Sequence, residues 1–261
     1  MNRISLADAR ETLLAAKRLC VFTGAGVSAE SGVPTFRDGG FWNDFPPEQF
    51  AHWEGIIRTA TTDPERLAQF LEAVVRPIAE AEPNAAHRAI AGFETADRPV
   101  TVITQNIDGL HPEAGSSVVH EIHGSLLRRA DLLGNKRGAV TRAELLAVAD
   151  RMNLRPRNAF MIWRAIRPLL ERDGLNVIRP DLVLFGDEMA EPDWTLAKRT
   201  AASAEVMLTV GTSGAVFPAA TLPHQLLERG RPVIVVDPQP PEHGLWVEGP
   251  AAEVVPMLLR P

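Results

Sequence analysis

A series of short apolar runs, each ended by glycine or by polar residues, divides the chain. Every run is nearly continuous and rich in β-branched residues, instead of alternating between apolar and polar positions. Such runs are typical of strands that are buried on both faces of a parallel sheet. The expected strands lie within residues 17–24, 98–106, 116–124, 179–186, 205–213 and 231–237.

Stretches with helical spacing lie between these runs. Helices are expected over residues 5–18, 64–78 and 83–94. Ser5 can cap the first helix, and Pro64 and Pro77 are expected to begin and end the second. Strands that alternate with helices predict an α/β fold, a Rossmann-like parallel sheet with helices on both faces.

Two stretches, residues 41–80 and 126–178, interrupt this alternation because neither contains a strand pattern. We interpret them as insertions that together form a smaller helical module beside the sheet. The rest of the chain is expected to form the Rossmann-like core, within a single domain over residues 1–261. The core then consists of residues 1–40, 81–125 and 179–261.

The second insertion carries two helix signals. Thr141 and Glu144 have the T-x-x-E spacing of a capping box at the start of a helix. Further along, Pro168 is expected to kink or divide a helix whose apolar face packs against the module. That face is expected to carry Phe160, Trp163, Ile166 and Leu170. We interpret its aromatic residues as core packing, not as a ligand-binding set.

Composition narrows the class of protein. The chain has 261 residues, 45% of them hydrophobic, which is ordinary for a globular protein with a substantial core. A formal net charge of -6 gives no support for broad nucleic-acid binding. A single cysteine, Cys20, excludes a disulfide within the chain and an all-cysteine metal site. No charged leader precedes an apolar stretch, and no apolar run reaches membrane-spanning length, so we expect a cytoplasmic protein.

The first apolar run ends in a glycine turn. Residues 24–29 read GAGVSA and match G-x-G-x-x-G/A, a turn whose glycines let the backbone approach a pyrophosphate. A plain tight turn is the alternative. The acidic residue that a Rossmann site uses for ribose is missing from its usual place. Asp237, at the end of a later strand, suits that role better, with a turn or cap role as its alternative.

Two histidines lie near the end of the run 116–124. His123 is followed by Gly124, so its imidazole can face a cleft and, with a pKa near neutrality, can accept a proton. His120 lies three residues earlier, and side chains three apart on a strand face opposite sides. We therefore do not expect the two histidines to share a metal ion, and we expect His120 to be structural.

These local patterns join into one family. The chain resembles the sirtuins, the NAD-dependent protein lysine deacylases, in successive motifs that occur in family order over nearly all of its length except residues 126–178. The motifs read GAGVSAESGVPTFR, TQNIDGLHPEAG, EIHGS, PDLVLFGDEM, GTSGAVFPAA and GPAAEVVPML. The segment PNAAHRAIA resembles a sirtuin helix as well.

The resemblance implies a site for NAD and a groove for an acyl-lysine protein or peptide. It implies NAD contacts for Gly24, Ala25, Gly26, Ser28, Thr35, Phe36, Arg37, Gln105, Asn106, Ile107, Asp108, Gly211, Thr212, Ser213, Asp237 and Ala251. It implies substrate contacts for Val183, Phe185, Gly186 and Val216, with the peptide added as a strand between two edges. His111 matches a motif histidine and is expected to be structural.

The resemblance also implies the reaction. His123 would be the general base, with Asn106 and Asp108 as further catalytic residues, in a deacylation that releases nicotinamide and O-acyl-ADP-ribose. Two alternatives stay open: mono-ADP-ribosyl transfer or NAD hydrolysis, and an NAD-binding scaffold without turnover. Neither sequence-specific nucleic-acid binding nor membrane binding is expected, and the sequence leaves the oligomeric state and protein substrate open.

Two departures from the family pattern stand out. Sirtuins usually carry four zinc-binding cysteines between the HGS and FGE motifs, whereas residues 126–178 contain neither cysteine nor histidine. We therefore expect no metal site, and packing in place of zinc. Sirtuins that prefer acidic acyl groups carry Tyr and Arg on the helix after the cofactor loop, but the chain has no tyrosine and Leu71 takes that position. An apolar pocket for acetyl or longer acyl chains is expected.

Overall fold

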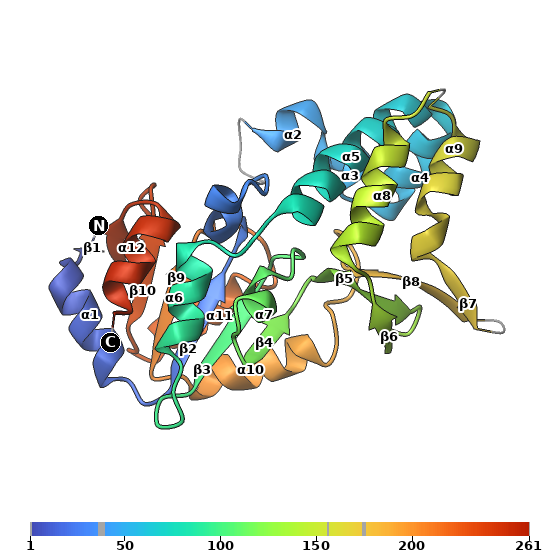
Figure 1. Ribbon diagram of the computed structural model, residues 1–261. Coiled ribbons are helices and arrows are strands. Elements are labelled where there is room, and N and C mark those ends of the chain that lie inside the picture. The colour runs from blue at the N-terminus through green and yellow to red at the C-terminus, as the bar shows by residue number, and fades with distance from the viewer. Residues whose placement is uncertain (1, 36–39, 156, 174–175, 261) are drawn as a thin grey trace. The chain divides into compact units, whose positions relative to one another are not determined.

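The computed structural model describes residues 2–35, 40–155, 157–173 and 176–260, and it divides into two compact units (Figure 1). Unit 1 consists of residues 1–31, 82–122 and 191–261. Unit 2 consists of residues 32–81 and 123–190. Each unit is described by itself.

Unit 1 is built on a seven-stranded sheet in which all neighbouring strands pair in parallel. Its strands are β1 (Asn2–Arg3), β2 (Leu19–Thr23), β3 (Val100–Thr104), β4 (Val118–Glu121), β9 (Val206–Val210), β10 (Val233–Asp237) and β11 (Leu245–Glu248). Every residue of β2, β9 and β10 is buried, as expected for strands covered on both faces. The predicted Rossmann-like sheet is confirmed. The short strands β1 and β11, which lack a long apolar run, were not predicted.

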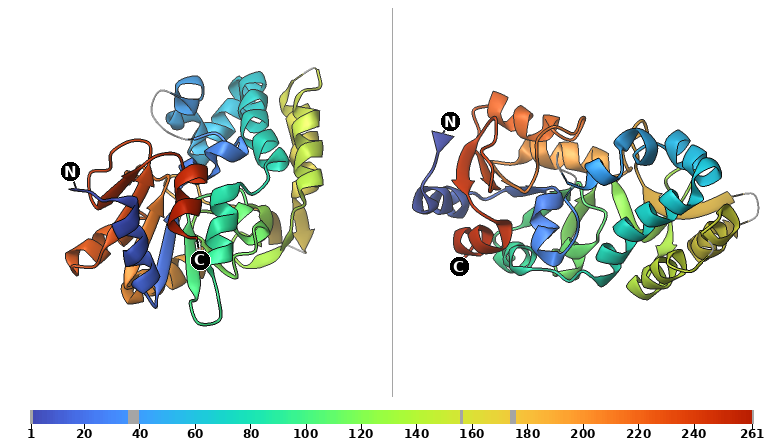
Figure 2. Two further views of the ribbon diagram at one scale, coloured as in Figure 1. Left: turned by 60° about the vertical axis from the view of Figure 1, so that its left-hand side comes forward. Right: turned by 90° about the horizontal axis from the view of Figure 1, so that it is seen from above.

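Helices cover both faces of this sheet. They are α1 (Leu6–Ala15), α6 (Ala85–Phe93), α7 (Leu110–Glu113), α10 (Asp193–Ser203), α11 (Thr221–Glu228), α12 (Ala251–Leu258) and the 3-10 helix η1 (Ala25–Ser31). Side chains of α1, α6 and α12 share one core cluster with the strands, and α10 and α11 lie against the opposite face (Figure 2). The predicted cap is confirmed, because the Ser5 hydroxyl accepts from the Asp8 amide at 3.1 Å.

The strand order fixes where a ligand can bind. The order across the sheet is β1-β11-β10-β9-β2-β3-β4, so the chain runs outward from β2 on one side and outward from β9 on the other. In doubly wound sheets, ligands bind outside the carboxyl ends of the strands where this order reverses. The junction of β2 and β9 is that point in unit 1.

Unit 2 contains a four-stranded antiparallel sheet in the order β6-β5-β8-β7. Its strands are β5 (Gly124–Asp131), β6 (Lys136–Ala139), β7 (Glu171–Asp173) and β8 (Asn176–Leu182). Two predictions were wrong here: residues 126–178 are not without strands, and the run 179–186 does not join the parallel sheet. An apolar run alone does not distinguish a parallel strand from an antiparallel one. In β5, Arg128 and Arg129 interrupt the apolar pattern that would have revealed the strand.

The helices of unit 2 agree in part with the predicted helical module. They are α2 (Phe41–Asp44), α3 (Pro47–Phe50), α4 (Trp53–Thr62), α5 (Pro64–Glu80), α8 (Arg142–Met152), α9 (Ala159–Ile166) and the 3-10 turn η2 (Arg167–Leu169). The capping box of Thr141 and Glu144 is confirmed. Pro77 does not end α5, which continues to Glu80. A proline removes one backbone hydrogen bond but keeps a helical φ, and beyond Pro77 the Ile78 carbonyl accepts from Arg142, the first residue of α8.

The expected apolar face around Phe160 and Trp163 was wrong. Phe160 is 68% exposed and Trp163 is 52% exposed. The buried side chains of α9 are Ile162 and Ala165, one position removed from the predicted stripe. The predicted division at Pro168 is confirmed, because α9 ends at Ile166 and Pro168 lies in η2.

A buried arginine joins several elements of unit 2. Arg129, on β5, is 7% exposed, and its guanidinium donates to Glu144 Oε1 at 3.0 Å and to the Pro168 carbonyl at 3.3 Å. The same group donates to the Ala139 carbonyl at the end of β6. Charge-assisted bonds of this kind are about twice as strong as neutral ones. Arg129 therefore links β5, β6, α8 and η2.

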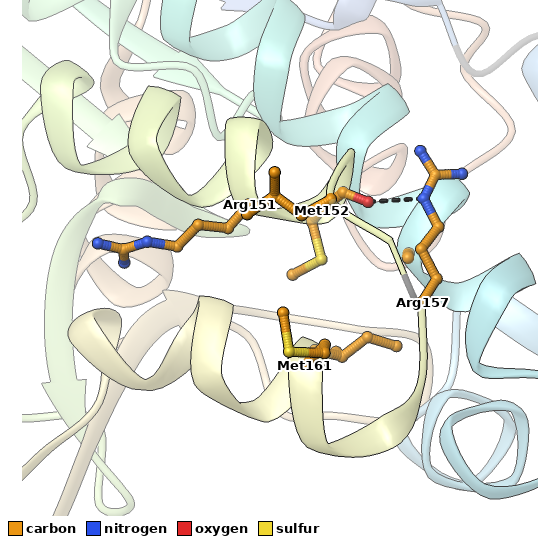
Figure 3. A pocket seen from close by; sticks show the side chains of 7 residues that line it. Arg151, Met152, Arg157 and Met161 are labelled. Atoms are coloured by element: carbon orange, nitrogen blue, oxygen red, sulfur yellow. Dashed lines mark hydrogen bonds between the residues drawn. The ribbon is translucent and has the colours of Figure 1, made fainter.

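Arginines fix two more connections in this unit. Arg137 donates to Asp131 Oδ2 at 2.6 Å across the turn between β5 and β6. Hydrogen bonds from Asn135, and then from Arg137 and backbone amides, lower the pKa of Asp131 to about 2. Arg157 donates to the Met152 carbonyl at 2.7 Å where α8 ends (Figure 3). Met152 and Met161 point toward one another and line a shallow hollow between α8 and α9 (Figure 3).

Two further properties bear on function. Burial raises the pKa of the Cys20 thiol to about 12, so this cysteine is not a nucleophile at neutral pH. Among the described residues, no helix is both long and apolar enough to cross a membrane.

We predict that Glu144→Gln destabilises the protein at pH 7 but not near pH 2. Hydrogen bonds from the Thr141 amide and hydroxyl, and then from Arg129, lower the pKa of Glu144 to about 2. This carboxylate therefore stabilises the fold fully above its unfolded pKa of about 4.3, and the contribution is lost as the pH falls toward about 2. Glutamine can still accept in the capping box, so the change removes mainly the charge facing Arg129.

The measurement is the melting temperature of wild type and variant between pH 7 and pH 2. The difference in melting temperature between wild type and Glu144→Gln should shrink as the pH falls from 7 to 2. The control is Glu54→Gln, which removes the carboxylate of an exposed ion pair with Arg58 and should change the melting temperature little. A gap that stays constant down to pH 2 would contradict the role assigned to the Glu144 charge.

Candidate functional site

The carboxyl ends of β2 and β9 meet through two glycine turns. The Gly26 amide donates to the Gly211 carbonyl at 2.9 Å, and the Gly24 amide donates to the Val210 carbonyl at 3.1 Å. A Cβ atom on Gly26 would lie 2.6 Å from Gly211 Cα, and one on Gly211 would lie 2.4 Å from the Gly26 carbonyl carbon. Gly211 also has a φ of +61°, which favours glycine. Only glycine fits at this contact, because the backbone of each turn occupies the space that a side chain on the other would need.

Ser28, in η1, is the centre of a buried polar cluster. Its hydroxyl donates to Asp108 Oδ2 at 2.7 Å and accepts from Asn106 Nδ2 at 3.0 Å. His87 Nε2 lies 3.4 Å from the same oxygen. A hydroxyl can donate once and accept twice, so these partners satisfy Ser28 and hold the amide and carboxylate in fixed positions. All four side chains are buried.

His87 is a site residue that the sequence predictions missed. Its Nδ1 accepts from the Asn84 amide at 3.3 Å, in a capping box at the start of α6, so Nε2 carries the proton that faces Ser28. Burial, and then the charge of Arg88, lower the pKa of His87 to about 4, so the ring is neutral at pH 7. The Asn-x-x-His spacing of a capping box was the signal that could have found it.

His111, on α7, lies against the end of β2. Its Nε2 lies 2.9 Å from Thr23 Oγ1, and Thr23 donates to Thr104 Oγ1 at 2.8 Å. Burial, and then the neighbouring His87, hold the pKa of His111 well below its usual value. His111 is therefore neutral and ties α7 to the end of β2, where Thr23 in turn bonds to β3, which is a structural position.

The loops after β3 and β9 are also joined. The Gln105 amide donates to the Thr23 carbonyl at 3.0 Å, and Gln105 Nε2 donates to Thr212 Oγ1 at 2.9 Å. The Ser213 hydroxyl accepts from the Ala215 amide at 3.3 Å, which shapes the turn that follows. Ile107 is half-buried between the polar residues of the β3 loop.

Asp237 lies at the carboxyl end of β10 and is 3% exposed. Its Oδ1 accepts from the Gln239 amide at 2.8 Å, which is the turn role considered as its alternative. Ala251 is buried at the first position of α12. The NAD contacts predicted for Ala251 and Asp237 stay predictions.

Unit 1 therefore gathers most of the predicted NAD residues at one edge of its sheet. They follow β2, β3, β9 and β10 or begin α12: Gly24, Ala25, Gly26, Ser28, Gln105, Asn106, Ile107, Asp108, Gly211, Thr212, Ser213, Asp237 and Ala251. The glycine contact and the buried Asn106–Asp108 pair fit a dinucleotide with a phosphate bridge and a carboxamide end. Val216 lies in the same unit, before α11.

The other predicted residues belong to unit 2. His123 lies in the two-residue link between β4 and β5, so it follows the strand and is not part of it as predicted; it is half-buried. Its carbonyl accepts from the Val183 amide at 3.1 Å, directly after β8. Phe185 and Gly186 follow in a turn. Thr35 is half-buried, whereas Phe36 and Arg37 lie outside the described residues. Pairing of one peptide with both predicted edges stays a prediction.

A metal site would need several ligand side chains close together. Among the side chains that the structure describes, no three His, Cys, Asp or Glu residues are grouped as metal ligands. His120 instead lies on β4, with Nε2 at 3.4 Å from Thr200 Oγ1 and Nδ1 at 3.9 Å from Asp193 Oδ1. These partners suit a structural histidine.

Comparison with known proteins connects this geometry to a family. Residues 24–218 match the model of the Sir2 family. An NAD-dependent protein deacylase of Mycobacterium tuberculosis is 39% identical over 250 residues, which cover 93% of this chain and 97% of the relative. The solved structure of a Sir2 homologue in complex with NAD has a TM-score of 0.77 and 31% identity, covering 99% of this chain and 94% of the other.

A second solved structure is a Sir2 protein bound to a myristoylated histone peptide, with a TM-score of 0.69 and 28% identity, covering 97% of this chain and 94% of the other. The similarity therefore extends over both units, including the segment that lacks the usual cysteines. By its sequence motifs, its parallel sheet and these similarities, the chain belongs to the Sir2 family.

Proposed function

We propose that this protein is an NAD-dependent protein lysine deacylase with His123 as its general base. The observation that carries the proposal is the buried cluster of Ser28, Asn106 and Asp108 beside the Gly26–Gly211 contact, at the point where the strand order reverses. Relatives that span nearly the same length are NAD-dependent protein deacylases. NAD, when bound, supplies the ribose carbon to which the acyl oxygen becomes attached.

The buried polar cluster holds Asn106 and Asp108 in positions from which they could act on NAD. Asn106 can orient a carboxamide through its amide group, and the Asp108 carboxylate places negative charge where positive charge develops at the ribose. Neutral His87 and Ser28 keep these two side chains in place without adding a competing positive charge. His123, half-buried and followed by Gly124, can accept a proton from a ribose hydroxyl.

Zinc independence is part of the proposal. The second insertion has no cysteine, and Arg129, Arg137 and Arg157 make the connections between its strands and helices. These contacts support an insertion held by packing and charge-assisted hydrogen bonds instead of a metal. The cytoplasmic location stays a prediction, and the oligomeric state stays open.

We predict that wild type converts an acetyl-lysine peptide, NAD and one water to nicotinamide, free lysine peptide and O-acetyl-ADP-ribose. His123→Ala should lower this turnover by about a hundredfold or more, because a general base contributes at least that much. His224→Ala, on α11, is the matched control and should turn over like wild type. Mass spectrometry of the products measures all three reactions.

The products also separate the alternatives. ADP-ribosylated protein or free ADP-ribose in place of O-acetyl-ADP-ribose would point to ADP-ribosyl transfer or NAD hydrolysis. No consumption of NAD with any acyl peptide would leave a binding protein. Equal turnover by wild type and His123→Ala would contradict the role of His123.

We further predict that acetyl or myristoyl peptides react faster than a succinyl peptide. Leu71, half-buried on α5, offers no hydroxyl to an acidic acyl group, and the chain has no tyrosine to replace it. Steady-state kcat/KM for the three peptides measures the preference. Fastest turnover of the succinyl peptide would contradict an apolar acyl pocket.

A further inference from the structure

The segment after β8 forms a closed turn in unit 2. The Asp187 amide donates to the Leu184 carbonyl at 3.1 Å, and Gly186 between them has a φ of +91°. The Asp187 side chain reaches back, so that its Oδ2 accepts from the Leu184 amide at 3.0 Å. Residues 184–187 are thus closed by a backbone bond and by a carboxylate.

A tryptophan from another part of the same unit holds this turn. Trp53 is the first residue of α4, and its indole N–H donates to Asp187 Oδ2 at 2.8 Å. One carboxylate oxygen therefore accepts both from the turn and from Trp53. Close by, the Phe185 amide donates to the Ala51 carbonyl at 2.8 Å. Two hydrogen bonds thus attach the turn to residues 51–53.

Surrounding side chains keep the indole in place but do not bury it. The Arg179 guanidinium, on β8, lies 5.0 Å from the Trp53 ring centre, within the range of a cation–π contact. Trp53 remains 37% exposed and Phe185 47% exposed. The specific feature of Trp53 is therefore its N–H donor to Asp187, more than its packing.

The turn is part of the segment proposed to bind the peptide. Val183, Phe185 and Gly186 are the residues proposed to receive the acyl-lysine peptide, and the Val183 amide bonds to the His123 carbonyl at 3.1 Å. Beyond Leu182 no further strand pairing fixes this segment among the described residues. Its shape depends instead on Asp187 and on the contacts to residues 51–53.

We propose that Trp53 is a positioning residue for the peptide substrate: through its bond to Asp187 it fixes the turn 184–187 and thus the backbone that receives the acyl-lysine peptide. This inference rests on the proposed deacylase function. A peptide that binds as an added strand must find its edge already ordered, or else its binding energy is reduced by the cost of ordering that edge. Trp53 acts on peptide binding and not on the reacting atoms.

The test is Trp53→Phe, which keeps an aromatic ring beside Arg179 but removes the donor together with part of the ring system; the Trp194→Phe control carries the same loss of ring volume. We expect KM for an acetyl-lysine peptide to rise about tenfold, the effect of losing one hydrogen bond to a charged acceptor. KM for NAD and kcat should stay as in wild type. Trp194→Phe, at a partly buried tryptophan on α10 in unit 1, is the matched control and should change none of these values.

Two further measurements separate positioning from general stability. Amide hydrogen exchange in Trp53→Phe should speed up at residues 184–187 and not in the rest of unit 2. Asp187→Asn should raise the peptide KM in the same direction, and the double variant should fall short of the sum of the two effects because both act through one contact. A lower melting temperature with unchanged peptide KM would overturn the inference.

The outcomes distinguish this inference from the proposed function. If wild type does not deacylate any peptide, the proposed function fails. Binding of a fluorescein-labelled acetyl-lysine peptide, measured by anisotropy, then still compares wild type with Trp53→Phe. Equal peptide affinity in both, or an equal loss in Trp194→Phe, would overturn the role of Trp53.

Discussion

Backbone contact between the turns after β2 and β9 is the constraint on which the rest of unit 1 depends. Gly26 and Gly211 approach so closely that a Cβ atom on either would overlap the other's backbone. This contact joins the two halves of the sheet at the reversal of strand order. It also sets the start of η1, which places Ser28 against Asn106 and Asp108. The dinucleotide site follows from a steric condition that only glycine meets.

Unit 2 depends on a different kind of interaction. Its strands and helices are joined at Arg129, Arg137 and Arg157, each of which donates to carboxylates or to backbone carbonyls. Such bonds are directional, so they can fix these connections without a metal, as proposed above. Directional hydrogen bonds also hold the turn 184–187, where the Trp53 indole and the Phe185 amide attach the segment proposed to receive the peptide to residues 51–53.

Sequence patterns revealed the parts of the fold that rest on continuous burial. The strands β2, β3, β9 and β10 carry nearly uninterrupted apolar runs, and the capping signals of Ser5 and Thr141 act over one helical turn. Sequence patterns failed where residues distant in the chain determine whether a side chain is buried. Arg129 is buried in β5 only because Glu144 and the Pro168 carbonyl receive it. Helix α9 carries two apolar stripes, and its packing against α8 decides that the stripe with Ile162 and Ala165 is the buried one. His87 was missed because its partner Ser28 is distant in sequence.

Binding of ADP-ribose tests the central claim most directly, since it requires the glycine contact without any chemical step. Isothermal titration calorimetry should show that wild type binds ADP-ribose and that Gly26→Ala, folded by circular dichroism, binds about 5- to 150-fold more weakly, the effect of roughly 1–3 kcal/mol of overpacking. Gly92→Ala, in α6 where a Cβ meets no atom within 4 Å, should bind like wild type. A folded Gly26→Ala protein with wild-type affinity for ADP-ribose would contradict the account.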